Sequence, residues 1–244
     1  MSNSYYNIVH LEEIDSTNDY AQKLISTNKQ VDRTIVLADY QTKGKGQRNN
    51  VWSSEKSKNL LMSIILQNIN LEPAKYFYLS MITSLAIVKT LNKIVKKNVE
   101  IKWPNDILIN SKKVAGILIT NTIRQNKINN SIIGIGINVN QSIFESELSN
   151  ATSIFRETIK KYEVSEILTE VLDNFFSLYN KDFNEIKNNY EQNMFKIGKL
   201  AELVDGKGTL IKSKILGIKQ NGELIVNIKG RIKNINHSEY RLII

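Results

Sequence analysis

The sequence has no cysteine, and its two histidines, His10 and His237, lie far apart along the chain. The absence of cysteine excludes disulfide scaffolds, cysteine-ligated zinc and cysteine nucleophiles. Two distant histidines do not form the short-spaced pattern of a histidine-rich metal site. The chemistry of this chain must therefore rest on other residue types.

Long apolar runs and targeting segments are also absent. The N-terminal stretch MSNSYYNIVHLEEIDSTN has neither the basic region nor the apolar core of a signal peptide. Lys, Asn or Gly interrupts the most apolar stretches well before the roughly 18 residues that a membrane span needs. The sequence therefore predicts no membrane association and a cytoplasmic location.

Basic residues outnumber acidic ones, with 33 Lys and Arg against 24 Asp and Glu and a net charge of +9. Such a surplus can mark a nucleic-acid-binding surface. The basic residues are mostly lysines, however, and they are spread along the whole chain. The surplus is therefore interpreted as general lysine richness. The 244 residues, 41% of them hydrophobic, allow a large domain with or without a small one.

Apolar runs and helical patterns alternate through most of the chain. DSTNDYAQKLI (15–25) is typical of a helix start, in which Ser16 can cap and Asp19 completes a capping box. Strands are predicted at 34–40, 59–66, 99–103 and 131–139, a hairpin at 106–120, and further helices at 73–95, 163–179 and 181–193.

The character of the sequence changes near residue 197. From there the chain consists of short strands with turn signals, among them Asn221-Gly222, a strong hairpin turn. Closely spaced strands of this kind are typical of a small β-barrel. The sequence thus predicts two domains, residues 1–196 and residues 197–244.

The stretch KGKGQRNNVW (43–52) follows a predicted buried strand. It is neither a Walker A motif nor a complete dinucleotide fingerprint, because Asn49 stands where a third glycine would be. Its glycines still let backbone N–H groups approach an anion, and Lys43, Lys45 and Arg48 add charge. The pattern alone leaves two alternatives open, an anion-binding loop and a solvated connection.

Three further stretches place polar or small residues at strand ends. In KWPND (102–106), the proline stiffens a turn that holds Asn105 and Asp106 where site residues are common. A turn that only satisfies local backbone groups is the alternative. KKVAGILI (112–119) and GIGIN (134–138) have glycines inside strands, which lets a ligand lie against a sheet. An edge lysine and a β-bulge are the alternatives there.

The chain resembles the biotin–protein ligase family in five stretches that follow that family's order and spacing: DSTN (15–18), QTKGKGQRNNVW (41–52), KWPND (102–106), KVAGIL (113–118) and GIGINVN (134–140). Near the C-terminus, NGEL (221–224) and HSEY (237–240) are similar to the family's SH3-like domain. The resemblance covers nearly the whole chain. It implies an α+β fold, a mixed β-sheet with helices packed on one side as in class II synthetases, followed by a small all-β SH3-like barrel.

The resemblance also implies a two-step reaction. Biotin and ATP would give biotinyl-5′-AMP and pyrophosphate, with Mg²⁺ bridging the phosphates. The ε-amine of one lysine on a biotin carboxyl carrier protein or domain would then displace AMP. A homodimer is one assembly that the family forms. A lipoate or octanoate–protein ligase with the same chemistry is the alternative, although no His-Asp signature of that kind occurs in this chain.

Site residues are carried over from the matching motifs. The expected catalytic residues are Lys113, Asp106 and Arg48. Biotin is expected to lie among Ser16, Thr17, Asn18, Gln41, Gly44, Gly46, Gly116 and Leu118. The nucleotide is expected to contact Lys45, Gln47, Trp52, Asn105 and Asn138. Lys113 would reach the biotin carboxylate and the α-phosphate, and Asp106 would assist either Mg²⁺ or the acceptor lysine.

Two departures from the family are visible. The family often has G-R-G-R where this chain has G-K-G-Q, so Gln47 replaces an arginine that helps to retain the adenylate. Arg48, Lys43 or Lys45 could supply the missing charge. Some members carry an N-terminal winged-helix domain and repress transcription. Because DSTN begins at residue 15, no DNA-binding role is expected here.

Overall fold

The computed structural model describes residues 6–27, 30–145, 148 and 150–244. Two compact units divide the chain. The first unit consists of residues 1–73 and 113–170, and the second consists of residues 74–112 and 171–244.

The first unit is built mainly of long strands. Its elements are β1 (Asn7–Ile14), α1 (Thr17–Thr27), β2 (Thr34–Gln41), the 3-10 turn η1 (Gln47–Asn49), β3 (Leu60–Leu71), β6 (Lys112–Arg124), β7 (Lys127–Ile137) and α3 (Ile154–Thr158). β1 pairs with β2 in parallel, whereas the pairs β2–β3, β3–β7 and β6–β7 are antiparallel. Helix α4 (Val164–Tyr179) begins in this unit and ends in the second.

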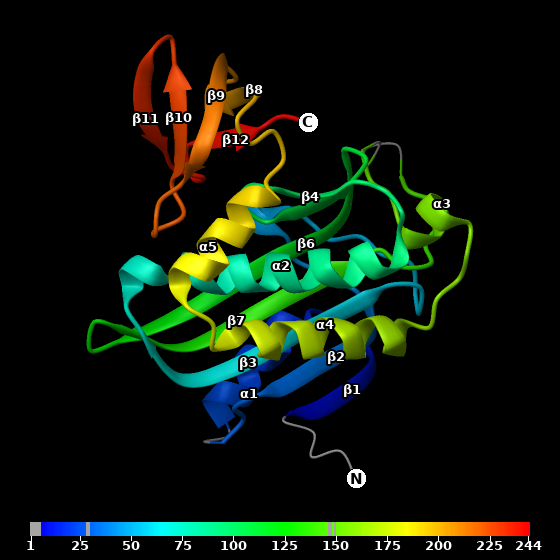
Figure 1. The fold of residues 1–244 in the computed structure, drawn as a ribbon. Helices are drawn as coiled ribbons and strands as arrows, with labels where there is room; N and C mark the ends of the chain where they lie inside the picture. The colour runs from blue at the N-terminus through cyan, green and yellow to red at the C-terminus, as the bar shows by residue number, and fades with distance from the viewer. Residues whose placement is uncertain (1–5, 28–29, 146–147, 149) are drawn as a thin grey trace. The chain divides into compact units, whose positions relative to one another are not determined.

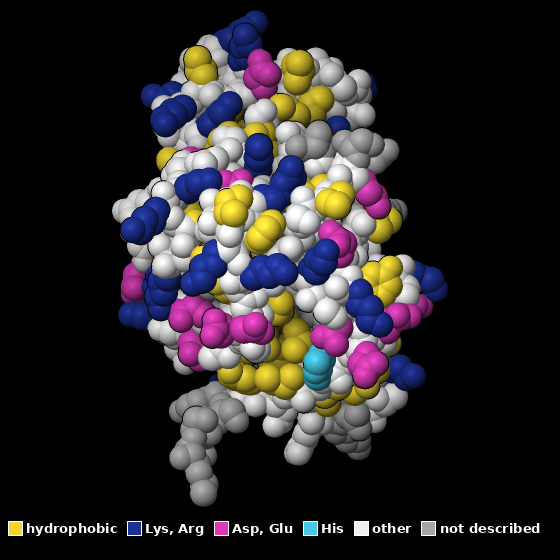
Figure 2. All heavy atoms as spheres, turned by 90° about the vertical axis from the view of Figure 1, so that its right-hand side faces the viewer, with side chains coloured by type: hydrophobic (Ala, Val, Ile, Leu, Met, Phe, Trp, Pro, Cys, Tyr) yellow, Lys and Arg dark blue, Asp and Glu magenta, His cyan; other side chains and the backbone are white. Residues whose placement is uncertain are grey.

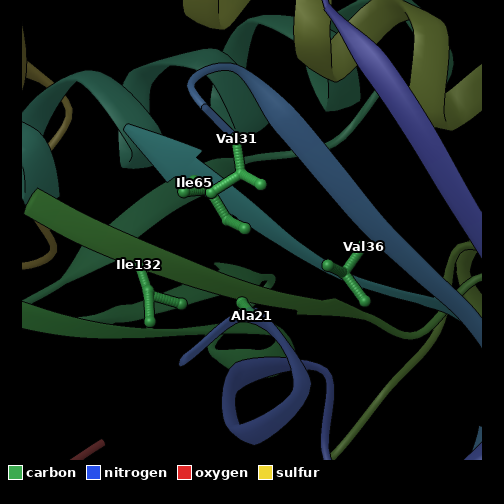
Figure 3. Packing of buried hydrophobic residues seen from close by; sticks show 5 residues of the cluster. All are labelled: Ala21, Val31, Val36, Ile65 and Ile132. Carbon is green, nitrogen blue, oxygen red and sulfur yellow. The ribbon is translucent and has the colours of Figure 1, made fainter. Parts of the chain in front are cut away.

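An apolar cluster holds α1 against these strands, as Figure 3 shows. Its buried members are Ala21, Val31, Val36, Ile65 and Ile132, and Leu11, Tyr20, Leu24 and Ile25 pack against them. Burial of each large aliphatic side chain contributes about 1.5–3 kcal/mol. The cluster therefore fixes the first turn of α1, with Thr17 and Asn18, relative to β2, β3 and β7.

The second unit combines helices, a short hairpin and the C-terminal strands. Its elements are α2 (Phe77–Ile94), β4 (Val99–Lys102), β5 (Asp106–Ile109), α5 (Phe183–Gln192), β8 (Leu200–Asp205), β9 (Leu210–Ile218), β10 (Leu224–Ile228), β11 (Arg231–Ile235) and β12 (Tyr240–Leu242). The Glu191 carboxylate ties α5 to β9, because its Oε1 accepts hydrogen bonds from Lys187 Nζ and Ile218 N, each at 2.8 Å.

Strand pairing produces two sheets, most of whose strands are labelled in Figure 1. A mixed sheet of seven strands has the order β1-β2-β3-β7-β6-β5-β4, and a sheet of five strands has the order β11-β10-β9-β8-β12. The neighbours in the five-stranded sheet are all antiparallel. These sheets confirm the predicted α+β class, and the second is consistent with an SH3-like barrel.

Most predicted elements are present, with shifted ends. Helix α2 begins at Phe77 because Pro73–Lys75 form a separate 3-10 turn, η2. β3 runs on to Leu71 through Asn68 and Asn70, whose φ angles of 54° and 50° are positive. Strand β1 and helix α3 were not predicted. β1 is an edge strand with many exposed positions, and α3 has only 5 residues, so neither has a strong apolar period.

The predicted domain boundary between residues 196 and 197 lies just before β8 and stays a prediction. Figure 2 shows Lys and Arg side chains dispersed over one face, with Asp and Glu among them. That distribution agrees with general lysine richness on this face. No helix in the described part of the chain has the length and apolar character that crossing a bilayer requires.

Candidate active site

A polar network joins the first turn of α1 to three strands. Thr17 donates to Gln41 Oε1 of β2 from its backbone N at 2.7 Å and from Oγ1 at 3.0 Å. Ser63 Oγ of β3 lies 2.8 Å from Thr17 Oγ1 and 2.6 Å from Asn18 Oδ1. Asn18 Nδ2 donates to Leu118 O of β6 at 3.3 Å. The network thus fixes hydroxyl and amide groups beside an apolar sheet.

Two glycines on neighbouring strands form a floor without side chains. Gly116 of β6 and Gly136 of β7 are register partners. The Trp52 indole lies against both, since a Cβ at Gly136 would be 2.5 Å from Trp52 Cε2 and one at Gly116 would be 2.9 Å from Cζ3. Lys113 Nζ is 5.6 Å from the centre of the same ring, within cation–π range. The structure therefore brings together three predicted site residues, Trp52, Lys113 and Gly116.

The glycine-rich loop, residues 43–52, is closed by its own backbone. Trp52 N donates to Gly44 O at 2.9 Å, and Gly46 N donates to Asn50 O at 2.7 Å. A Cβ at Gly44 would be 2.5 Å from Trp52 O. Glycine at position 44 is therefore required for the close approach that returns the chain to Trp52.

Two exposed ion pairs connect this loop to the start of α1. Lys43 Nζ lies 2.9 Å from the Asp15 carboxylate, and Lys45 Nζ lies 2.7 Å from the Asp19 carboxylate. A hydrogen bond from Thr42 Oγ1, at 2.6 Å, and then Lys43 lower the pKa of Asp15 below its ordinary value. Both lysines that could replace the family's missing arginine are thus engaged with acids of their own chain.

Half of the predicted capping box at Ser16 is formed. Ser16 precedes α1 as expected and is buried, and its Oγ accepts a long hydrogen bond of 3.5 Å from Asp19 N. The Asp19 carboxylate binds Lys45 instead of turning back to Ser16. At the tip of the loop, Gln47 is half-buried and Arg48 is exposed in a left-handed conformation with φ 56° and ψ 40°.

Asn138 directly follows β7 and is buried. Its Nδ2 donates to Thr152 O at 2.9 Å, and Thr152 N donates to Lys113 O at 2.8 Å. This amide therefore braces the strand that carries Lys113. Among the described residues, no hydrogen-bond partner is present for Asn138 Oδ1. That oxygen remains available as an acceptor for an amino group.

Asn105 and Asp106 belong to the second unit, at the turn between β4 and β5. Lys102 and Asp106 are register partners across the turn, with Nζ 3.5 Å from Oδ2. Trp103, the first residue of the turn, is 1% exposed and donates from Nε1 to Gly222 O at 2.8 Å. The KWPND stretch therefore combines a carboxylate facing a lysine with a deeply buried indole.

Sequence reasoning gave no site role to Ser63, Lys102 or Gly136. Ser63 interrupts the apolar run LLMSIIL, and Gly136 stands in the quoted GIGIN stretch. Both positions could therefore have been predicted as site residues from the sequence. Within residues 6–27, 30–145, 148 and 150–244, no group of three or more His, Asp or Glu side chains could hold a metal ion.

Comparison with known proteins decides the family. The model of the biotin/lipoate A/B protein ligase family matches residues 11–138. The bifunctional ligase/repressor BirA of Bacillus spizizenii is 33% identical over 243 residues, which cover 96% of this chain and 74% of the relative. This chain belongs to the biotin/lipoate A/B protein ligase family.

Other relatives agree with that membership. The biotin protein ligase from Aquifex aeolicus in complex with biotin and ATP has a TM-score of 0.82 and 29% sequence identity, over 98% of this chain and 99% of that chain. The biotin–[acetyl-CoA-carboxylase] ligase of Mycobacterium tuberculosis is 25% identical over 142 residues, 57% of this chain and 51% of that protein. The predicted family and fold are confirmed.

Proposed function

We propose that this member of the family is an ATP-dependent biotin–protein ligase, which forms biotinyl-5′-AMP and transfers biotin to a lysine of a biotin carboxyl carrier protein or domain. The observation that carries the proposal is the arrangement of Trp52 and Lys113 over the paired glycines of β6 and β7. The names of the Aquifex and Mycobacterium relatives support biotin and ATP as substrates and a carboxylase as the acceptor.

Biotin is proposed to bind beside the first turn of α1. Its ureido ring needs hydrogen-bond donors and acceptors within an apolar slot, and the linked side chains of Thr17, Asn18 and Gln41 supply both kinds. Ser16 adds a buried hydroxyl next to them. Gly116 and Leu118 are proposed to line the same pocket, and the loop glycines, Gly44 and Gly46, would let the backbone close over it.

In the first step a biotin carboxylate oxygen attacks the α-phosphorus of ATP. The bond from that phosphorus to the bridging oxygen breaks, and pyrophosphate leaves. The substrate itself supplies the nucleophile, which suits a chain without cysteine. The main obstacle is the approach of two anions, so the protein must provide positive charge and position. Lys113 provides both at the glycine floor, and Arg48 adds charge from the loop.

Adenine is proposed to bind between Trp52 and Asn138. Stacking of a base on an aromatic ring contributes about 1–3 kcal/mol. The Asn138 Oδ1 acceptor suits the exocyclic amino group of adenine. Lys45, Gln47 and Asn105 complete the proposed nucleotide contacts. Closure of loop 43–52 then excludes water, which would otherwise hydrolyse the mixed anhydride.

Mg²⁺ is proposed to bind with the nucleotide. One protein carboxylate together with phosphate oxygens is an ordinary donor set for this ion. Asp106, a partly buried carboxylate, fits that description. The bound ion would neutralise phosphate charge.

In the second step the neutral acceptor amine attacks the acyl carbon of biotinyl-AMP. An amide forms, AMP leaves, and the amine loses a proton. Asp106 is proposed to accept a hydrogen bond from the incoming amine and to orient it. The C-terminal strands, residues 197–244, are proposed to form a separate SH3-like domain that follows a catalytic domain of residues 1–196 in the sequence.

The decisive test is incorporation of labelled biotin into a carrier domain with ATP. We expect incorporation with biotin and little with lipoate, and labelling with lipoate alone would contradict the proposal. The role of Asp106 is tested with preformed biotinyl-AMP, from which Asp106→Asn should transfer more slowly than wild type. The matched control is Asp173→Asn, which makes the same change on helix α4.

A further inference from the structure

The buried tryptophan of the KWPND stretch has no role in the function proposed above. We propose that Trp103 is a positioning residue, whose indole hydrogen bond to Gly222 in the C-terminal sheet sets the turn that presents Asp106. The C-terminal strands would then govern the transfer step through one side chain. This inference rests on the proposed function, because it acts through the role of Asp106 in transfer.

The turn itself is short. Residues 103–105 link β4 to β5, and Asp106 is already the first residue of β5. Its side chain faces Lys102, the register partner on β4. Because so few residues separate the two positions, a displacement of Trp103 is passed directly to Asp106.

Trp103 is fixed from several sides within the second unit. Its Nε1 donates to Gly222 O at 2.8 Å, and the ring of His237 lies edge-on to the indole, with centroids 6.2 Å apart and planes at 84°. Gly222 is held in turn by the β9–β10 connection, since Gly222 N donates to Lys219 O at 3.0 Å. The acceptor for the indole is therefore itself a constrained atom.

Aromatic packing leaves no room for a side chain at Gly222. A Cβ at Gly222 would overlap the ring of Phe77, which is buried in α2. Phe77 in turn meets Tyr190 of α5 edge-on, with centroids 5.7 Å apart. Gly222 also has a φ of 77°, which disfavours any other residue. The indole, the turn glycine and these two rings form one packed group.

Strand β4 is secured independently of the indole. Ile101 N donates to Asn193 O at 2.8 Å, and Phe195 N donates to Ile101 O at 2.9 Å. These bonds fix β4 immediately before the turn, without help from Trp103. Loss of the indole N–H should therefore loosen the turn while β4 keeps its place, which separates positioning from folding.

The first test is a double-mutant cycle on the transfer step. Trp103→Phe keeps a buried aromatic ring and removes the donor to Gly222. Single-turnover transfer from preformed biotinyl-AMP should fall about tenfold, well within the ~100-fold that a 1 Å misplacement can cost. On an Asp106→Asn background the same change should have almost no further effect. An equal fall on both backgrounds, or no fall in the wild-type background, would overturn the proposal.

A second pair of variants tests the other partner of the hydrogen bond. Gly222→Ala pushes the turn against Phe77 and should slow transfer as Trp103→Phe does. Gly230→Ala is the matched control, because Gly230 also has a positive φ, 86°, yet a Cβ there meets no atom within 4 Å. Gly230→Ala should transfer like wild type. Equal rates for the two alanine variants would contradict the inference.

The two levels of proposal fail in different ways. A wild-type chain that transfers no biotin overturns both the proposed function and this inference. A wild-type chain that transfers biotin, with Trp103→Phe and Gly222→Ala as fast as wild type, overturns the inference alone.

Discussion

The two tryptophans of this chain occupy contrasting settings. Trp103 is 1% exposed, and its N–H group is hydrogen-bonded to the C-terminal sheet. Trp52 is only half-buried and rests on two glycines. Its N–H group has no hydrogen-bond partner among the residues that the structure describes. One indole is fixed by the fold, whereas the other is carried by a loop.

We propose that the contrast reflects two tasks. A residue that closes over a ligand must move to admit it, so shallow contacts and exposed ion pairs suit it. A residue that orients a reacting group must not move, so it should be held by more contacts than folding alone needs. The following predictions test whether the two settings differ in this way, from the largest expected effect to the smallest.

Removal of the two indoles should lower the stability of the protein by different amounts. Trp103→Ala should lower the free energy of unfolding by about 3–5 kcal/mol, because it leaves a large cavity and an unsatisfied carbonyl. Trp52→Ala should lower it by a smaller amount, about 1–2 kcal/mol, because the ring is only partly buried. Urea denaturation measures both changes, and equal losses would remove the distinction between the two tryptophans.

Lys113 is the charged neighbour of the Trp52 indole. Lys113→Gln should slow formation of biotinyl-AMP about 100- to 1,000-fold, the cost of losing one preorganised donor to a developing anion. Lys112→Gln is the control, since Lys112 is the exposed preceding residue. Pyrophosphate release measures the step. A loss below tenfold in Lys113→Gln would mean that other groups neutralise the phosphate.

The motifs predicted which residues lie together better than the contacts that hold them in place. Trp52, Lys113 and Gly116 could be predicted because each stands in a quoted motif. Lys113 and Gly116 lie on β6, and Trp52 ends loop 43–52. The hydrogen bond between Trp103 and Gly222 could not be predicted from the motifs. It joins residues 119 positions apart and depends on tertiary packing.

The same limit applies to the lysines of loop 43–52. The sequence shows their charge, but only the fold shows that α1 begins where Asp15 and Asp19 face them. Strand β1 escaped prediction for a related reason. Its stability comes from pairing with β2 and not from an apolar period of its own.

Gln47 offers a way to add a charged contact from loop 43–52 to the adenylate. Gln47→Arg should slow release of biotinyl-AMP by about tenfold or more, because a charge-assisted hydrogen bond to an anion contributes about 1.5–3 kcal/mol. Gln220→Arg adds the same charge next to the β9–β10 turn and should leave release unchanged. An unchanged rate in Gln47→Arg would show that Arg48 already fills this role.

The ring of Trp52 should affect the release of biotinyl-AMP but not the binding of biotin. Trp52→Ala should speed release of biotinyl-AMP by about 5- to 100-fold, the range expected for one lost stacking contact. The affinity for biotin alone should change little, because biotin is proposed to lie beside α1. Trp52→Phe keeps a ring and should recover part of the loss. A similar loss of biotin affinity in Trp52→Ala would place the indole on biotin instead.

The weakest expected effect concerns the ion pairs that tie the loop to α1. Asp19→Asn removes the partner of Lys45, and an exposed pair of this kind contributes about 0.2–1 kcal/mol. Release of biotinyl-AMP should therefore rise at most about fivefold at low ionic strength. The difference from wild type should vanish near 1 M salt, where the screening length is about 3 Å.

Glu185 of α5 forms a comparable exposed pair with Lys181, which precedes the helix, and Glu185→Gln should leave release unchanged at every salt concentration. Slower release in Asp19→Asn would reverse the interpretation. Asp19 would then compete with the adenylate for Lys45, so that the free lysine binds the phosphate more tightly. The direction of this small change in release rate thus decides between two roles for Asp19. Either its ion pair with Lys45 holds the loop closed, or it keeps Lys45 from binding the phosphate.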